Sequence, residues 1–231
     1  MTYFLPQFLI RPFRACRALA LLLFLLVSVF VHSLQGSPSS QDRGATQRVL
    51  ERLIAAAVER TQHVVRYDPE YVRIPYPGGD VPASTGVCTD EVIRVYRAVG
   101  IDLQREMHMD ILNQPSAYPR KWAGNPHSSG AASTDTNIDH RRVLNLMIFF
   151  GRHGESLPLS ADIRDYHPGD IVTWNLGGGI THIGIVVDQT SPQSGRYLVV
   201  HNIGRGPQME DVLFDWKIIG HYRYLGESIR R

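Results

Sequence analysis

The cysteine at position 88 is the residue of this sequence whose surroundings most favour covalent chemistry. It stands in Thr85-Gly86-Val87-Cys88-Thr89-Asp90-Glu91, where a loop rich in turn formers meets a helical pattern. A thiol at the N-terminus of a helix faces unsatisfied backbone N–H groups and the positive end of the helix dipole. Both favour the thiolate, which is the form that attacks carbonyl carbons. The sequence therefore predicts Cys88 as a nucleophile, with a small buried structural cysteine as the alternative.

A nucleophilic thiol needs a base, and two histidines in the last third of the chain can provide an oriented one. His182 begins an apolar strand pattern, and His201 ends the next one. If the turn between them is centred near Ser191-Pro192, His182 pairs with His201, because antiparallel strands pair by reflection about the turn. One ring can then take the thiol proton while the other fixes its tautomer. Asn202 takes the orienting role if the register slips by one residue.

Two further polar groups near these positions have both a functional and a structural interpretation. Asp90 lies in the first turn expected after Cys88 and is most simply a residue that complements the helix dipole. Arg141 belongs to the polar run Asp139-His140-Arg141-Arg142. This run predicts either a clamp for a carboxylate, which arginine binds bidentately, or a capped helix start with surface charges.

Metal and cofactor sites are not predicted. The Gly177-Gly178-Gly179 run lies between strand patterns without a following helix, so it is not a phosphate-binding loop. The three tryptophans are more typical of a core or groove wall than of a cofactor site: Trp122, Trp174 and Trp216. The remaining histidines show no close ligand spacing such as His-x-x-x-His; they include His108, His127, His153, His167 and His221.

Composition sets broad limits on the class of protein. The chain has 231 residues, with 43% hydrophobic and 20% charged side chains, values ordinary for a globular protein. Setting aside the three arginines of the N-terminal segment leaves 21 of the 24 basic side chains against 22 acidic ones, a net charge of −1. A nucleic-acid-binding protein normally carries a basic excess or a basic run, so no nucleic-acid partner is predicted.

The N-terminal segment has the pattern of an export signal. Arg11, Arg14 and Arg17 precede the apolar run 18–31, which is shorter than the roughly 20 residues of a membrane-spanning helix. We predict that residues 1–36 are a signal peptide or, alternatively, an uncleaved N-terminal anchor that would be the chain's link to a membrane. The protein would then be exported to the periplasm or cell envelope, or secreted. Cys88 would remain there as an unpaired thiol, which is unusual in an oxidising compartment.

The elements that must position these side chains follow from hydrophobic periodicity. Residues 37–45 predict a flexible leader, and one domain follows over residues 46–231. The long polar segment 114–138 predicts a rim or lid beside a site. Four helices are predicted from apolar spacing and terminal residues: 46–63, 88–99 closed by Gly100, 102–113 capped by Asp102, and 141–150 capped by Asp139 and ended by Gly151.

Strand patterns dominate the last third of the chain. Apart from a short strand-like piece at 71–74, they follow the helices in an antiparallel meander, which predicts an α+β domain. The predicted strands are 170–174, 182–187, 197–201, 212–214 and 220–224.

The order of these motifs resembles that of the NlpC/p60-type cysteine peptidases of bacterial cell walls, which have a compact papain-like α+β fold. The shared order is a Tyr and Gly-Gly loop, a Cys at a helix start, a Pro-Gly-Asp strand, and His-Ile-Gly-Ile-Val before a polar residue that ends the next strand. Within this group the chain resembles most the YijF-like family of unknown function (DUF1287), over about residues 45–225. The motifs that carry this resemblance are Gly86–Asp90, Asn137–Val143, Pro168–Val172 and His201–Gly204.

The resemblance implies roles for individual residues. Cys88 would be the nucleophile, His182 the base and His201 the residue that orients the base, in an acyl-enzyme mechanism on peptidoglycan stem peptides or another amide. Tyr76, before Gly78-Gly79, would lie near the nucleophile. The family usually has Asp-Cys-Ser-Gly at the nucleophile, whereas this chain has Val-Cys-Thr-Asp. Residues predicted to bind substrate are Tyr76, Asp90, Arg141 and Asn202.

Two other function classes remain open from the sequence. One is a non-catalytic module of the same fold that holds cell-wall peptide in an inactive groove. The other is a metal-dependent hydrolase built from the histidines, which a chelator would inhibit and a thiol reagent would not.

Overall fold

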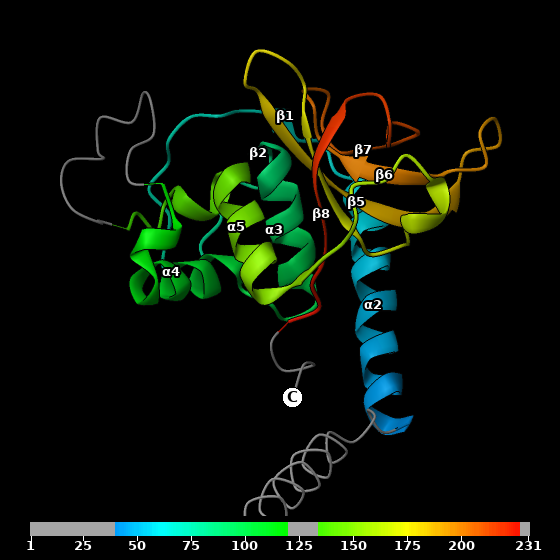
Figure 1. Ribbon diagram of the computed structural model, residues 1–231. Coiled ribbons are helices and arrows are strands. Elements are labelled where there is room, and N and C mark those ends of the chain that lie inside the picture. The colour runs from blue at the N-terminus through cyan, green and yellow to red at the C-terminus, as the bar shows by residue number, and fades with distance from the viewer. Residues whose placement is uncertain (1–39, 120–133, 227–231) are drawn as a thin grey trace, which may run out of the picture. The chain divides into compact units, whose positions relative to one another are not determined.

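The computed structural model describes residues 40–119 and 134–226 of the chain (Figure 1). The chain divides into two units, residues 1–43 and 44–231, and only residues 40–43 of the first are described. The predicted signal peptide or anchor lies outside the described residues, as do Trp122, His127 and most of the predicted rim or lid. Among the helices that the structure describes, none is long and apolar enough to cross a membrane.

The described part of the chain contains four α-helices. They are α2 (Ser40–Arg60), α3 (Cys88–Ala98), α4 (Leu103–Asn113) and α5 (Val143–His153). Residues 40–45, predicted as a flexible leader, belong to α2 instead. Asp42 lies in the first turn of that helix, where the helix dipole favours an acidic side chain.

The predicted helix ends are partly confirmed. Asp102 caps α4 by accepting a hydrogen bond from Arg105 N at 3.2 Å, and Gly100 follows α3 with φ of 89°. Asp139 does not cap α5, because its carboxylate accepts from Asp135 N at 2.6 Å and closes the preceding turn. A short 3-10 helix, η2 (Asp139–Arg141), comes first, and α5 then begins with Arg142 as its N-cap.

The main sheet has six antiparallel strands in the order β3-β8-β4-β5-β6-β7. Their bounds are β3 (Glu155–Ser156), β4 (Ile171–Asn175), β5 (Thr181–Thr190), β6 (Tyr197–His201), β7 (Gln208–Glu210) and β8 (Lys217–Arg223). The predicted meander holds from β4 to β7, but β8 returns to pair with the other side of β4. The predicted strand at 212–214 does not form, because Val212 and Leu213 turn into a buried cluster.

A separate two-stranded ladder stands close to the start of α3. It pairs β1 (Arg66–Tyr67) with β2 (Thr85–Gly86) in parallel, with Tyr67 opposite Gly86. The strand predicted at 71–74 does not form. Two further 3-10 helices complete the elements, η1 (Pro115–Ala117) and η3 (Ile163–Asp165).

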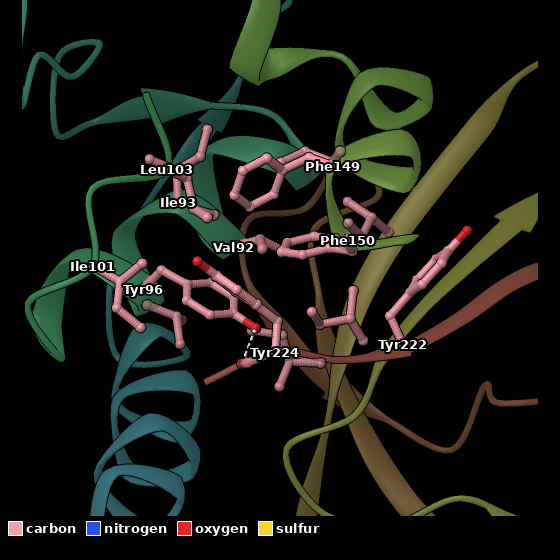
Figure 2. Close-up of a cluster of buried hydrophobic side chains, with 14 of the residues drawn as sticks. Val92, Ile93, Tyr96, Ile101, Leu103, Phe149, Phe150, Tyr222 and Tyr224 are labelled. Atoms are coloured by element: carbon pink, nitrogen blue, oxygen red, sulfur yellow. Dashed lines mark hydrogen bonds between the residues drawn. The ribbon is translucent and has the colours of Figure 1, made fainter. Parts of the chain in front are cut away.

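The two faces of the sheet carry different cores. The face formed by Ile183, Ile185 and Val187 of β5 packs against α3 and α5, which lie beside the sheet in Figure 1. Figure 2 shows the aromatic part of this core, where Tyr96 donates a hydrogen bond to the Tyr224 carbonyl at 2.9 Å. Val186 of β5 belongs to a second cluster on the opposite face. The predicted α+β class is therefore confirmed, with helices covering one face of an antiparallel sheet.

Candidate active site

The loop that leads into Cys88 is held by the buried side chain of Arg94. Its guanidinium donates to the carbonyl oxygens of Pro82 at 3.3 Å and Thr85 at 2.9 Å, and pairs with the Asp80 carboxylate at 3.0 Å. Arg94 lies on α3, the helix that begins with Cys88. These contacts therefore fix the incoming loop on the same helix that presents the thiol.

Asp90 and Arg141, both predicted to bind substrate, bind each other. Arg141 donates to the two carboxylate oxygens of Asp90 at 2.7 and 3.0 Å, and each side chain is 2% exposed. Asp90 also accepts from Val87 N at 2.7 Å, which satisfies a backbone N–H at the start of α3. The predicted carboxylate clamp is present, but its carboxylate belongs to the protein. The pair joins η2 to the start of α3 and so supports Cys88.

Gly86 and Asn202 connect the end of β6 to the chain just before Cys88. Gly86 has φ of 156°, and a Cβ there would lie 3.1 Å from the Asp90 Cβ. A side chain at this position would therefore crowd the first turn of α3. Asn202 is fully buried; its amide donates to the Gly86 carbonyl at 3.4 Å, and its oxygen accepts from Gly204 N at 3.1 Å. Both polar groups of the Asn202 side chain thus contact backbone atoms.

Burial dominates the electrostatics of Cys88. The side chain is 4% exposed, and burial raises the pKa of the thiol to about 12, with the negative charge of Asp90 acting in the same direction. The backbone N–H groups of Ile183, Thr89 and Cys88 itself lower this pKa, because they favour the thiolate. The prediction that the surroundings of Cys88 favour the thiolate is therefore wrong for the resting protein, because the effect of desolvation on the pKa exceeds that of the helix N-terminus. Cys88 rests as a neutral thiol.

A pocket of about 260 Å³ opens beside this thiol. It lies where the first residues of α3, α5 and β5 meet the end of β1. The lining includes the polar residues Tyr67, Cys88, Thr89, Arg141, Arg142 and Thr181. The thiol, although buried, thus forms part of the wall of a pocket.

The tyrosine beside the thiol is Tyr67, not the predicted Tyr76. Tyr67 lines the pocket, and burial followed by the charges of Cys88 and Asp90 raises its pKa to about 12. Tyr76 is 40% exposed and packs edge-on against His108, with ring centroids 4.9 Å apart. Sequence reasoning missed Tyr67, because a two-residue parallel pairing such as β1 with β2 leaves no periodic signal.

The β5–β6 register differs from the prediction by two residues. His201 pairs with Gly184, not with His182. Because side chains alternate along a strand, a shift of two residues keeps both histidines on one face of the sheet as diagonal neighbours. The rings still meet, with His182 Nε2 2.9 Å from His201 Nδ1. The predicted contact between the two imidazoles is therefore present in a different register.

Both imidazoles are enclosed. His182 is 2% and His201 1% exposed, and their rings pack near Trp216 with centroid separations of 6.0 and 6.1 Å. Burial, with a smaller effect of His201, lowers the pKa of His182 to about 3. Burial also lowers the pKa of His201, against the opposite effect of the Glu210 carboxylate. Both rings are therefore neutral near pH 7.

The thiol and the imidazoles approach the same point on β5 from different sides. Successive N–H groups along a strand point to opposite sides. Because Val186 N donates to Asp170 O on the β4 side, the N–H of Ile183, three residues earlier, points toward β6. Strand β6 ends at His201, and the ladder does not reach Ile183. The N–H of Ile183, the residue after His182, faces the sulfur instead.

The two halves of the site are close but not joined by a hydrogen bond. Within the described residues, no hydrogen bond connects the Cys88 sulfur to either imidazole. His182 uses only Nε2, for His201, and no partner is seen for Nδ1 in the described part of the chain. Nδ1 is the ring nitrogen nearer the backbone, and that backbone is where the sulfur lies. The His182 ring packs against Trp174, which belongs to the cluster on the sheet face away from Cys88, so proton transfer requires the ring and the thiol to turn toward each other.

Metal chemistry receives no support from the described residues. Nowhere in 40–119 and 134–226 do three or more His, Cys, Asp or Glu side chains gather as a metal site. His221 and His153 instead face carboxylates, those of Asp170 at 2.9 Å and Asp110 at 3.0 Å.

Comparison with known proteins gives two matches. A family model described as "Domain of unknown function (DUF1287)" matches residues 54–224. The "Uncharacterized protein YijF" of Escherichia coli (strain K12) is 44% identical over 205 residues, which span 88% of this chain and 96% of that protein. The matched region contains every residue of the candidate site.

Proposed function

The chain belongs to the DUF1287 family, and from this premise and the geometry of the site we propose that it is a cysteine hydrolase, an amidase or peptidase. In this proposal Cys88 is the nucleophile, His182 the base and His201 the residue that orients the base. The fold would be of the papain-like NlpC/p60 type, as the motif order suggests. The reaction needs no cofactor.

The proposed chemistry follows acyl transfer through a thioester. Nδ1 of His182 takes the proton of the thiol while the sulfur attacks the amide carbonyl carbon, and the same proton then passes to the leaving amine. Water hydrolyses the resulting acyl-enzyme and frees the thiol; an amine in place of water would give a transpeptidation. Backbone N–H groups at the start of α3 can stabilise the oxyanion, and the loss of one such donor typically costs about 2.7–4 kcal/mol.

One observation carries the proposal. A thiol at a helix N-terminus lines a pocket and receives the backbone N–H of the residue after His182, whose ring is fixed through Nε2 and has Nδ1 available. A merely structural cysteine would not need a pocket, a converging set of N–H groups and an oriented imidazole at the same place. Thiol-based acyl transfer uses these parts once the ring and the sulfur have turned to within hydrogen-bond reach of each other.

The resting protonation states constrain the mechanism. Because burial raises the pKa of Cys88 to about 12 and lowers that of His182 to about 3, the pair starts as thiol and neutral imidazole. An ion pair is not the ground state. The proton therefore moves as the carbonyl is attacked, which is general-base catalysis.

We propose peptide amides of peptidoglycan as the substrate class, in keeping with an exported protein of the periplasm or cell envelope. The pocket lining includes Arg142 and no Asp or Glu side chain, whereas Arg141, which also lines the pocket, is already paired with Asp90. Such a lining suits a substrate that carries carboxylates, as peptidoglycan stem peptides do.

Turnover of muropeptides tests the proposal. Purified wild-type protein is compared with Cys88→Ala and Cys88→Ser, with mass spectrometry of the products. We expect cleavage by the wild type only, together with a covalent adduct of acyl mass that is absent from both variants. Equal turnover by wild type and Cys88→Ala would end the proposal.

A non-catalytic peptide-binding module is the second candidate, and the raised pKa of Cys88 favours it. Alkylation of Cys88 by a neutral reagent at pH 7, in wild type and His182→Gln, separates the two functions. If His182 assists removal of the proton, the variant reacts more slowly. Equal rates together with tight muropeptide binding would identify a binding module.

A further inference from the structure

The imidazole pair continues to a third side chain, Glu210 on β7. Glu210 Oε2 lies 3.2 Å from His201 Nε2, and the His201 side chain is fully buried. The contact lies within interaction distance but is not aligned as a full hydrogen bond, and Nε2 has no other partner among the described residues. The carboxylate is therefore the group that decides the state of this nitrogen.

The contacts of Glu210 determine which nitrogen of each ring carries a proton. A carboxylate only accepts, so the neutral His201 ring is stable beside Glu210 when Nε2 is protonated and Nδ1 carries the lone pair. His182 Nε2, 2.9 Å away, must then donate its proton to His201 Nδ1. The opposite tautomer would direct the lone pair of His201 Nε2 at a negative charge. The unprotonated nitrogen of His182 is consequently Nδ1.

The other charged groups around His201 are compatible with this assignment. Arg205 donates to Glu210 Oε1 at 2.9 Å, which leaves Oε2 for His201. The Arg205 charge lowers the pKa of His201, and Asp215 raises it, both less than Glu210 does. Because burial keeps the His201 ring neutral, Glu210 affects which nitrogens of the two rings carry protons and not the net charge of the rings.

We propose that Glu210 is a positioning residue that acts through His201 to keep Nδ1 of His182 unprotonated and available as the base. The site would then be a four-residue relay, Cys88–His182–His201–Glu210. The structural part stands by itself, and its catalytic consequence rests on the proposed hydrolase function. The effect on turnover should resemble that of removing a carboxylate that orients a metal-bound histidine, about 10–100-fold.

Nitrogen-15 NMR of the histidine rings tests the tautomers directly in the folded protein. In the wild type, we expect the unprotonated signal at Nδ1 of His182 and at Nδ1 of His201. Glu210→Leu removes the acceptor and should redistribute both rings between tautomers, whereas Glu210→Gln retains an oxygen acceptor and should keep them. Asp188→Asn, an exposed carboxylate on β5, is the matched control and should change nothing.

The same variants are assayed on muropeptides. Glu210→Leu should lower kcat by about 10–100-fold with KM little changed, and Glu210→Gln should restore most of it. A wild-type proton on His182 Nδ1, or unchanged tautomers in Glu210→Leu, would overturn the relay whatever the activity. If the wild type has the expected tautomers but no activity, the hydrolase proposal fails and the relay remains.

Discussion

Two buried histidine clusters lie on the same sheet and differ in how their ring nitrogens are occupied. His221 on β8 has acceptors at both nitrogens, the Pro158 carbonyl at 3.0 Å and the Asp170 carboxylate at 2.9 Å. Asp170 is held in turn by Arg223 at 2.6 Å. His182 on β5 uses Nε2 for His201 at 2.9 Å, and Nδ1 has no partner within the described residues.

The contrast shows that burial and residue type do not distinguish a reactive histidine from a structural one. His221 is 1% exposed and His182 2% exposed, so both are shielded from water. The His221 cluster has a partner at each ring nitrogen, and it joins β8 to Asp170, the residue before β4, and to the Pro158 segment. The His182 cluster leaves Nδ1 without a partner among the described residues, and the N–H of the next residue, Ile183, faces the Cys88 sulfur. We propose that this difference is what makes His182 the reactive histidine.

The largest effect that tests this contrast is on turnover. His182→Gln removes the proposed base and should lower kcat by about 10²–10⁴-fold, the usual contribution of general-base catalysis. The matched His221→Gln should leave kcat within a few-fold and lower the stability of the fold instead. Steady-state kinetics on muropeptides and urea unfolding of both variants measure the two effects. The opposite pattern, with His221 controlling turnover, would reverse the assignment of the two clusters.

Asp170→Asn should have the next largest effect, and on stability. Asp170 is fully buried, and the change leaves Arg223 without its charge partner. Breaking a buried pair costs about 3–5 kcal/mol, and we expect the lower end because the Arg223 side chain is 32% exposed. Urea denaturation measures the free energy of unfolding, with exposed Asp188→Asn as the control. A loss no greater than that of the control would show that the His221 cluster contributes little.

The pH dependence of stability tests the burial of the His182 ring. The folded pKa of His182 is about 3 because the ring is buried, whereas an unfolded histidine has a pKa near 6.5. The unfolded state therefore binds more protons between these values, and stability should fall as the pH decreases from about 6.5 toward 3. His140, also lowered to about 3 by burial, acts in the same direction. Unfolding at several pH values should show a weaker dependence in His182→Gln, and an unchanged slope would contradict the buried neutral ring.

Local patterns were sufficient to predict much of the framework of the site. The apolar spacing Val92, Val95 and Tyr96 indicated the helix that begins at Cys88, and that start is confirmed. The prediction that the two histidines lie near each other was correct, although the predicted register was wrong by two residues. It would not have survived an error of one residue, which would have directed the rings to opposite faces of the sheet.

The parts that the sequence did not predict depend on contacts between distant segments. The two-residue strand β1 places Tyr67 by the thiol, and the three-residue strand β7 places Glu210 by His201, without a repeating pattern. The return of β8 to β4 depends on the closure of the whole sheet. The pKa of Cys88 had the opposite direction from that expected, because burial arises from packing that no single motif contains.

The smallest effect that we predict concerns Gly184, the residue opposite His201. A Cβ at Gly184 would lie 2.7 Å from Val199 Cγ1, 2.9 Å from the Val200 carbonyl oxygen and 3.1 Å from the His201 Cβ. Overpacking of this kind costs about 1–3 kcal/mol. Gly184→Ala should therefore destabilise the fold by that amount and displace His201 from His182, lowering turnover as well. In Gly151→Ala, the control in α5, the nearest atom is 3.8 Å away, so the helix should gain stability by up to about 1 kcal/mol. Full turnover in a destabilised Gly184→Ala protein would show that the His182–His201 contact is not needed for activity.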